Sequence, residues 1–152
     1  QDAILCTCDG VNYLTTPDRA RRFFRSACAQ LKPGGALIFD VSTPEKLSGT
    51  LGDHTLGCQE EDISYIWQNA YHPRTRTVDM RLSIFVRGED GRYQRLEETQ
   101  TQRAHTLEEL TEYLAEAGFA DIRTYGKLSL RAPRPGDERW HIRAVRPKEN
   151  AK

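Results

Sequence analysis

The stretch LKPGGALIFDV, residues 31–41, joins a helix end, a turn and an apolar strand. The Lys-Pro-Gly-Gly turn stops a helix, because proline lacks the backbone N–H and glycine accepts turn conformations. The run 36–41 is apolar almost without interruption, which predicts a strand that is buried on both faces. Upstream, residues 15–31 show helical spacing and residues 2–8 form another short apolar run. Strand, helix and strand in this order predict two parallel strands with a right-handed crossover, and therefore a doubly wound α/β sheet.

The predicted helix has a recognisable start and one apolar face. Thr16 is placed to cap the N-terminus, and Pro17 falls at the first helical position, where its missing N–H costs nothing. Phe23 and Phe24 belong to the apolar stripe. Four arginines lie largely off this stripe, and we interpret them as a solvated face: Arg19, Arg21, Arg22 and Arg25.

Composition narrows the classes of function. The sequence has 22 Lys plus Arg and 22 Asp plus Glu, so a net charge of zero favours neither nucleic acid nor an anionic membrane as partner. No apolar run approaches the roughly 20 residues of a membrane span, and no signal peptide opens the sequence. The four cysteines form no CxxC pair and no metal-ligand cluster. We therefore expect reduced thiols, no metal site and a cytoplasmic location.

The middle of the chain changes from an α/β pattern to an alternating one. A short helix is predicted at 42–49. Apolar residues then alternate with polar ones, most clearly in the second of three predicted strands: 57–73, 77–88 and 91–106. Alternation indicates a sheet with one exposed face. We expect a three-stranded antiparallel insert, at about 57–105, within a single partial domain that spans 1–152.

The last third returns to the α/β pattern. Residues 105–119 predict a helix, with Thr106 and Glu109 as a capping box and Gly118 as its stop. Two strands are expected to follow, 120–130 and 139–147. A Pro-rich loop joins them without a helix, which predicts an antiparallel pair at the end of the sheet. The tail, 148–152, is expected to be frayed.

Four stretches, in this order, resemble the C-terminal portion of a class I S-adenosylmethionine-dependent methyltransferase. DAILCTCDGVNYL resembles its fourth strand and following loop, LKPGGALIFDV its fifth strand, LEELTEYLAEAGF its last helix, and DIRTYG with RWHIRAVRP its last two strands. The segment with YIWQNAYHP and EETQTQR is similar to the insert of small bacterial methyltransferases. The resemblance implies a partial Rossmann-like sheet, S-adenosylmethionine as cofactor, and methyl transfer to a small-molecule acceptor.

One feature of that family is missing from the sequence. The family holds its cofactor with a Gly-rich loop after the first strand and an acidic residue at the end of the second, as dinucleotide sites do. This sequence has no G-x-G after a strand. We therefore expect a fragment of a longer transferase that is inactive alone. Two alternatives stay open: a non-catalytic binding or assembly module, or half of a two-chain protein; and another doubly wound enzyme, such as a nucleotide-using oxidoreductase.

Ligands of open α/β sheets bind at the carboxyl ends of the strands. The resemblance places the loop after the first apolar run near the methionine part of the cofactor and the transferred methyl. The predicted cofactor-binding residues are Thr7, Cys8, Asp9, Asn12 and Tyr13. Asp9 is a candidate acceptor for an ammonium group, and Tyr13 a candidate for cation–π contact with the sulfonium. The same residues also suit a turn with ordinary packing.

The insert carries the predicted acceptor site. A polar and aromatic cluster there gives the candidate substrate-binding residues: Trp67, Asn69, Tyr71 and His72. The catalytic residue is not identified. Candidate bases are the four histidines, His54, His72, His105 and His141, although transfer from a sulfonium can also proceed by positioning alone.

The first strand predicts a contact between copies of the chain. By the resemblance it lacks its usual neighbour, so Ala3–Cys6 becomes an apolar edge strand without charge or proline. Edge strands of this kind pair with other strands, most simply with two-fold symmetry. We therefore expect a homodimer through Asp2–Cys8.

Overall fold

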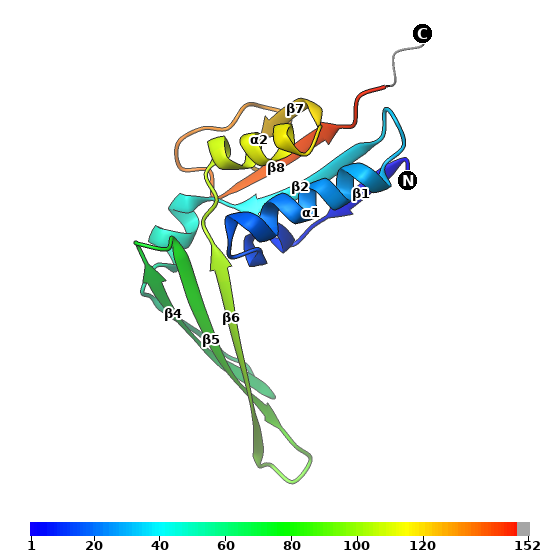
Figure 1. Ribbon diagram of the computed structural model, residues 1–152. Coiled ribbons are helices and arrows are strands. Elements are labelled where there is room, and N and C mark those ends of the chain that lie inside the picture. Colours follow the sequence, from blue (N-terminus) through cyan, green and yellow to red (C-terminus); the bar gives the residue numbers. More distant parts are fainter. Residues whose placement is uncertain (149–152) are drawn as a thin grey trace.

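The computed structural model describes residues 1–148 and contains two four-stranded sheets (Figure 1). The core sheet has the strand order β1-β2-β8-β7, and the insert sheet has the order β3-β4-β5-β6. The strands are β1 (Ala3–Cys6), β2 (Ala36–Ser42), β3 (Thr55–Gln59), β4 (Ile63–His72), β5 (Thr77–Arg87), β6 (Tyr93–Arg103), β7 (Ala120–Tyr125) and β8 (Arg139–Val145). The helices are η1 (Gly10–Tyr13), α1 (Pro17–Gln30), η2 (Lys46–Leu51) and α2 (Leu107–Glu116).

The predicted strand–helix–strand unit is confirmed. β1 pairs with β2 in parallel, with Ala3 opposite Ala36. The side chain of Thr16 caps α1 by accepting from the backbone N–H of Arg19 at 3.3 Å. β8 is antiparallel to both β2 and β7, which confirms the expected antiparallel end of the sheet. The α/β fold class with an antiparallel insert is therefore correct.

Both α-helices pack on one face of the core sheet. Phe24 of α1 and Phe39 of β2 are fully buried there, with ring centroids 5.4 Å apart. Leu110 and Leu114 of α2 join the same apolar cluster. Each such side chain is worth roughly 1.5–3 kcal/mol on burial, so this layer holds the helices to the sheet.

The opposite face of the core sheet is open over the first half of β2, so the prediction that β2 is buried on both faces is wrong there, whereas Asp40 and Ser42 on that face are buried. Ile38, whose neighbours Leu37 and Phe39 point into the core, is 39% exposed on the other face. Leu5 of β1 is 67% exposed. The expected edge position of β1 is confirmed in the described residues, since β1 ends the strand order.

The insert sheet has four strands, so the expectation of three is wrong. The predicted strand 57–73 contains a reversal at Glu60-Glu61-Asp62, where the N–H of Glu60 donates to the carbonyl of Ile63 at 2.9 Å. Three adjacent acids favour such an exposed turn. β3 lies before the turn and is exposed along its whole length, so burial gives it no alternating pattern.

Several boundaries also differ from expectation. The loop at 9–14 contains η1, and the helix expected at 42–49 is η2, which ends two residues later at Leu51. The strand expected at 120–130 ends at Tyr125, because the chain turns at Gly126, whose N–H donates to the carbonyl of Arg131 at 2.9 Å.

The predicted capping box of α2, formed by Thr106 and Glu109, is confirmed. Gly118 follows α2 with φ 93°, a conformation that suits glycine and supports its role as the stop. The expected frayed tail lies outside the described residues, apart from Lys148. Among residues 1–148, no helix has both the length and the apolar character needed to cross a membrane.

Candidate functional site

The loop after β1 has an unusual backbone. Cys8 and Asp9 have φ values of 60° and 61°, so two consecutive non-glycine residues are left-handed. Such conformations cost on the order of 1–3 kcal/mol each, so they persist only where the surroundings fix them. Here the carbonyl of Asp9 accepts from the N–H of Asn12 at 2.8 Å, which starts η1. The turn leaves Asp9 at the carboxyl ends of β1 and β2.

Arg139 connects two carboxylates at this edge of the sheet. Its Nη1 lies 2.9 Å from Oδ1 of Asp9, and its Nη2 donates to Oδ2 of Asp9 at 3.0 Å. The same guanidinium contacts the carboxylate of buried Asp40. Because β8 runs antiparallel to β2, its first residue lies opposite Ser42, the last residue of β2. The cation therefore offsets the repulsion between the two carboxylates.

A chain of hydrogen bonds continues from Asp9 to η2. The hydroxyl of Ser42 donates to Oδ1 of Asp9 at 2.9 Å and accepts from Nζ of Lys46 at 3.0 Å. Ser42 thus links a carboxylate and an ammonium that form no direct ion pair within the described residues. The loop after β1, the end of β2 and the start of η2 are fixed to one another by this chain.

Two cavities meet at Asp9. The first, here called the core cavity, has a volume of about 420 Å³ and is lined by Thr7, Cys8, Asp9, Ile38, Phe39, Asp40, Arg139 and His141. The second, the insert cavity, has a volume of about 190 Å³ and lies between η1, η2 and the insert sheet. Its lining consists of Asp9, Tyr13, Ser42, Lys46, Leu51, Trp67, Met80, Leu82, Gln100 and Gln102. Asp9 is the residue that the two linings share.

The predicted cofactor-binding residues divide into two groups. Thr7, Cys8 and Asp9 line the core cavity, and Tyr13 lines the insert cavity. Tyr13 donates its hydroxyl hydrogen to Oε1 of Gln100 at 2.5 Å and so links η1 to β6. No cavity lining described here includes Asn12.

Asn12 has a structural role. Its amide donates to the carbonyls of Ser42 at 3.1 Å and Arg103 at 3.0 Å, and accepts from the N–H of Ser42 at 2.9 Å. The residue is fully buried. Its side chain holds η1 against the ends of β2 and β6, and both amide hydrogens are used within the protein. Contact between Asn12 and a cofactor stays a prediction, and this geometry does not favour it.

The predicted acceptor residues do not form one cluster. Trp67, Asn69 and Tyr71 alternate along β4 and share the face that contacts η2, where Trp67 and Tyr71 pack on the apolar cluster around Leu47. His72 lies on the other face, where its Nε2 is 2.9 Å from the carboxylate of Asp79. Only Trp67 of the four predicted residues lines the insert cavity.

The candidate bases are also separated. His105 is fully buried, and burial, followed by the nearby Arg103, lowers its pKa to about 4. His54 is exposed, with Nδ1 3.1 Å from the carbonyl of Thr50. His141 lines the core cavity. Of the candidate bases, it is therefore the one that lies at a candidate site in the described residues.

Six polar residues of these two cavities were not predicted from the sequence: Asp40, Ser42, Lys46, Gln100, Gln102 and Arg139. Arg139 was findable in principle, because an antiparallel last strand places its first residue beside the end of β2. The two glutamines face the cavity only because of the register between β5 and β6, which composition does not determine. Among residues 1–148 no group of His, Cys, Asp and Glu side chains is arranged to hold a metal ion.

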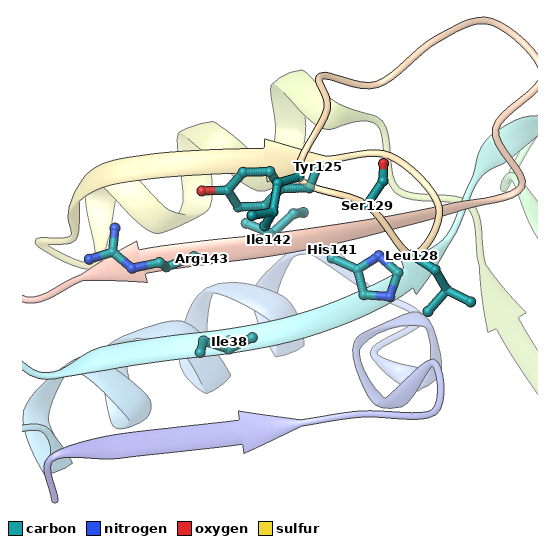
Figure 2. A pocket seen from close by; sticks show the side chains of 8 residues that line it. Ile38, Tyr125, Leu128, Ser129, His141, Ile142 and Arg143 are labelled. Carbon is teal, nitrogen blue, oxygen red and sulfur yellow. The ribbon is translucent and has the colours of Figure 1, made fainter.

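A third cavity lies on the open face of the core sheet (Figure 2). It has a volume of about 440 Å³ and a mainly apolar lining that includes Ile38, Tyr125, Leu128 and Ile142. Figure 2 shows these side chains coming from β2, β7, β8 and the loop after β7. Leu128 is 85% exposed. This open-face cavity adjoins the core cavity, because Ile38 and His141 contribute to both linings.

The sequence and the fold are both similar to those of bacterial methyltransferases. No family model matches the sequence. The Bacillus subtilis (strain 168) protein named "Putative methyltransferase YqeM" is 35% identical over 147 residues, which cover 97% of this chain and 59% of that protein. A protein of Geobacillus sp. (strain WCH70) with the same kind of name is 32% identical over 138 residues, or 91% of this chain and 56% of its own. The chain therefore spans less than two thirds of the length of the curated relatives that it matches.

Two solved structures with a similar fold are also methyltransferases. An S-adenosylmethionine-dependent methyltransferase from Clostridium acetobutylicum ATCC 824 aligns with a TM-score of 0.89 and 28% identity over 97% of this chain and 58% of its own. CalS10, an amino pentose methyltransferase from Micromonospora echinaspora, shares the fold with a TM-score of 0.73 and 21% identity over 95% of this chain and 58% of its own. The chain has the fold of the class I S-adenosylmethionine-dependent methyltransferases, which confirms the resemblance read from the sequence.

Proposed function

We propose that the chain forms part of the active site of a longer S-adenosylmethionine-dependent methyltransferase, with the acceptor in the insert cavity. The observation that carries this proposal is that Asp9 is shared by the walls of the core and insert cavities. Methyl transfer requires the methyl donor and the acceptor to approach each other without intervening water. Two cavities with a common wall at the carboxyl end of β1 suit that requirement, and this is the edge where α/β sheets bind ligands.

The residues that would hold the methionine part of the cofactor are Thr7, Cys8 and Asp9. The loop is tightly folded, since a Cβ at Gly10 would lie 2.8 Å from Sγ of Cys6. The fit to the whole cofactor is partial, because the carboxylate of Asp9 is already shared with Arg139 and no Gly-rich loop follows a strand in the sequence. When bound, S-adenosylmethionine supplies a methyl group that its sulfonium has already activated.

This chain's own residues would position the acceptor. Trp67, Met80 and Leu82 of the insert sheet form the apolar wall of the insert cavity, opposite the hydrogen-bonded chain of Asp9, Ser42 and Lys46. A volume of about 190 Å³ suits a small molecule or one group of a larger one. Holding the reacting atoms in line can by itself supply a large part of the rate enhancement. The proposal therefore needs no histidine in the insert cavity.

Calorimetric titration with S-adenosylhomocysteine tests the cofactor assignment. The protein expressed from the complete reading frame that contains this chain should bind with a dissociation constant at or below the micromolar range, and Asp9→Asn should weaken binding. Lack of binding by the folded protein would reject the assignment. The 152-residue chain alone should show no binding at micromolar ligand. Micromolar binding by that chain would instead reject the idea that it is only part of the cofactor site.

A second candidate function is that of an assembly module, and the open face of the core sheet favours it. Leu128 and Leu130 lie exposed beside the open-face cavity, and β1 has one edge without a neighbouring strand among residues 1–148. Monomeric proteins seldom leave such apolar surface uncovered. Sedimentation velocity of the 152-residue chain, first alone and then mixed with the longer protein expressed from its complete reading frame, separates the two functions. A stable complex that lacks affinity for S-adenosylhomocysteine would support the module.

A further inference from the structure

We propose that the insert cavity binds an acceptor that carries one carboxylate group, and that the ammonium of Lys46 pairs with that group. The inference rests on the proposed function, because it names the chemical class of the acceptor in that cavity. Three observations carry it: a lysine in the lining without a carboxylate partner, an acid in the lining that is already paired, and a wall of apolar side chains from the insert sheet.

Lys46 is the first observation. It is half-buried at the start of η2, and it is the one cationic side chain that lines the insert cavity in the described structure. Its Nζ donates to the hydroxyl of Ser42 at 3.0 Å, and no carboxylate of residues 1–148 lies within 4.0 Å of it. An ammonium has three N–H donors, and one of them is used here. The others are free to meet an anionic group of a ligand.

The pairing of Asp9, the acid of the same lining, is the second observation. Its carboxylate lies 2.9 and 3.0 Å from two nitrogens of Arg139 and accepts from Ser42 at 2.9 Å. Arg139 therefore offsets part of the repulsion between Asp9 and an incoming anion. Glu98, on the same face of β6, is exposed and lies outside the lining. A cationic acceptor would find Asp9 occupied and Lys46 repulsive, whereas a carboxylate finds free N–H donors.

The rest of the lining is the third observation, and it limits the kind of anion. Phosphate groups are usually bound by several cations or by arginine, whose planar guanidinium makes two parallel hydrogen bonds. No arginine of the described residues lines the insert cavity, and its volume is about 190 Å³. Trp67, Met80 and Leu82 give it an apolar wall. A small organic acid with one carboxylate on an apolar body fits this lining.

A matched series of three probes tests the inference on the protein expressed from the complete reading frame that contains this chain. Benzoate, benzamide and benzylammonium share one ring and carry, at neutral pH, an anionic, a neutral and a cationic head group. In ligand-detected NMR titrations, the dissociation constant of benzoate should be about tenfold below those of the other two, as one hydrogen bond between charged groups predicts. Equal or tighter binding of benzamide or benzylammonium, or no binding of any probe, would overturn the inference.

Lysine variants show whether the probe binds in the insert cavity. Lys46→Met should weaken benzoate binding about tenfold and abolish its advantage over benzamide, whereas Lys46→Arg keeps the charge and should keep the advantage. The matched control is Lys32→Met, which removes the same charge from a lysine that pairs with Asp2 and lies outside the insert cavity. That control should leave benzoate binding within about twofold. Unchanged benzoate binding in Lys46→Met would refute the role of this lysine.

Two further comparisons make every outcome decisive. If Lys46→Met fails to fold, the three probes on the parent protein still decide. Affinity for S-adenosylhomocysteine is measured separately on the same parent. A parent that binds S-adenosylhomocysteine without preferring benzoate refutes this inference and leaves the proposed function intact. A parent that prefers benzoate without binding S-adenosylhomocysteine supports the carboxylate site and rejects the cofactor assignment.

Discussion

Replacement of Arg139 by methionine should destabilise the chain more than any comparable arginine replacement on β8. Methionine keeps much of the aliphatic length of the side chain and removes the guanidinium. The carboxylates of Asp9 and Asp40 then face each other without their shared cation. Ser42 still donates to Asp9, but no other cation within 4 Å of either carboxylate is described in residues 1–148.

The exposure of the three charged side chains determines how much the free energy of unfolding should fall. The side chain of Arg139 is 28% exposed, that of Asp9 18% and that of Asp40 8%. Removing one partner from a fully buried ion pair costs about 3–5 kcal/mol, and an exposed pair is worth about 0–1 kcal/mol. This site lies between those limits but nearer the buried one, so we expect a loss of about 2–3 kcal/mol in the free energy of unfolding. For a chain of this size, that is a fall of about 4–12 °C in Tm.

Urea unfolding followed by circular dichroism measures the loss. The control is Arg143→Met on the same strand, because Arg143 pairs with Asp121 where the two side chains are 38% and 47% exposed. That control should lose less than about 1 kcal/mol. Adding Asp40→Asn to Arg139→Met should restore part of the stability, since it removes one of the two repelling charges. A loss below about 1 kcal/mol for Arg139→Met, or no recovery with Asp40→Asn, would refute the argument.

Three further predictions concern other parts of the molecule. His105 has its pKa lowered to about 4 from 6.5, so the unfolded chain binds more protons between these values and stability should fall as pH drops through that window. The loss should be roughly 2 kcal/mol between pH 7 and pH 5, measured by urea unfolding, and His105→Gln should abolish this pH dependence. In the product of the complete reading frame, Trp67→Ala should weaken acceptor use while affinity for S-adenosylhomocysteine stays within about threefold; the reverse pattern would assign Trp67 to the cofactor. Light scattering at tens of micromolar should show dimers of the chain that Ile4→Lys converts to monomers; a monomeric parent contradicts pairing through β1.

The elements with strong local signals were predictable from the sequence. Thr16 with Pro17, and Thr106 with Glu109, mark helix starts by chemistry that acts within one turn, so α1 and α2 begin where expected. β3 gave no such signal, because it is exposed on both faces and follows no alternation. The open face of β2 was equally hidden, since an apolar residue such as Ile38 looks the same in sequence whether or not another layer covers it.

The residues of the candidate site were predictable only where they directly follow a strand in the sequence. Thr7, Cys8 and Asp9 were found because they come directly after a strand. Arg139 and Gln102 reach the two cavities through strand register, which depends on contacts between residues far apart in the sequence. His72 lies apart from Trp67 because residues five apart on a strand point to opposite faces, and the acceptor role of the four candidate residues stays a prediction.

The apolar wall of the insert cavity belongs to a different sheet from the walls of the core cavity, and this has a consequence for how such proteins diversify. The residues proposed to meet the cofactor belong to the core sheet and its loops, whereas Trp67, Met80 and Gln102 belong to a sheet with its own hydrogen-bond ladder. Substitutions in the insert can therefore reshape the apolar wall of the insert cavity while the walls of the core cavity keep their geometry. Under the proposed function, a lineage exchanges one acceptor for another by altering β4, β5 and β6, and laboratory evolution of new acceptor preference is confined to the same three strands.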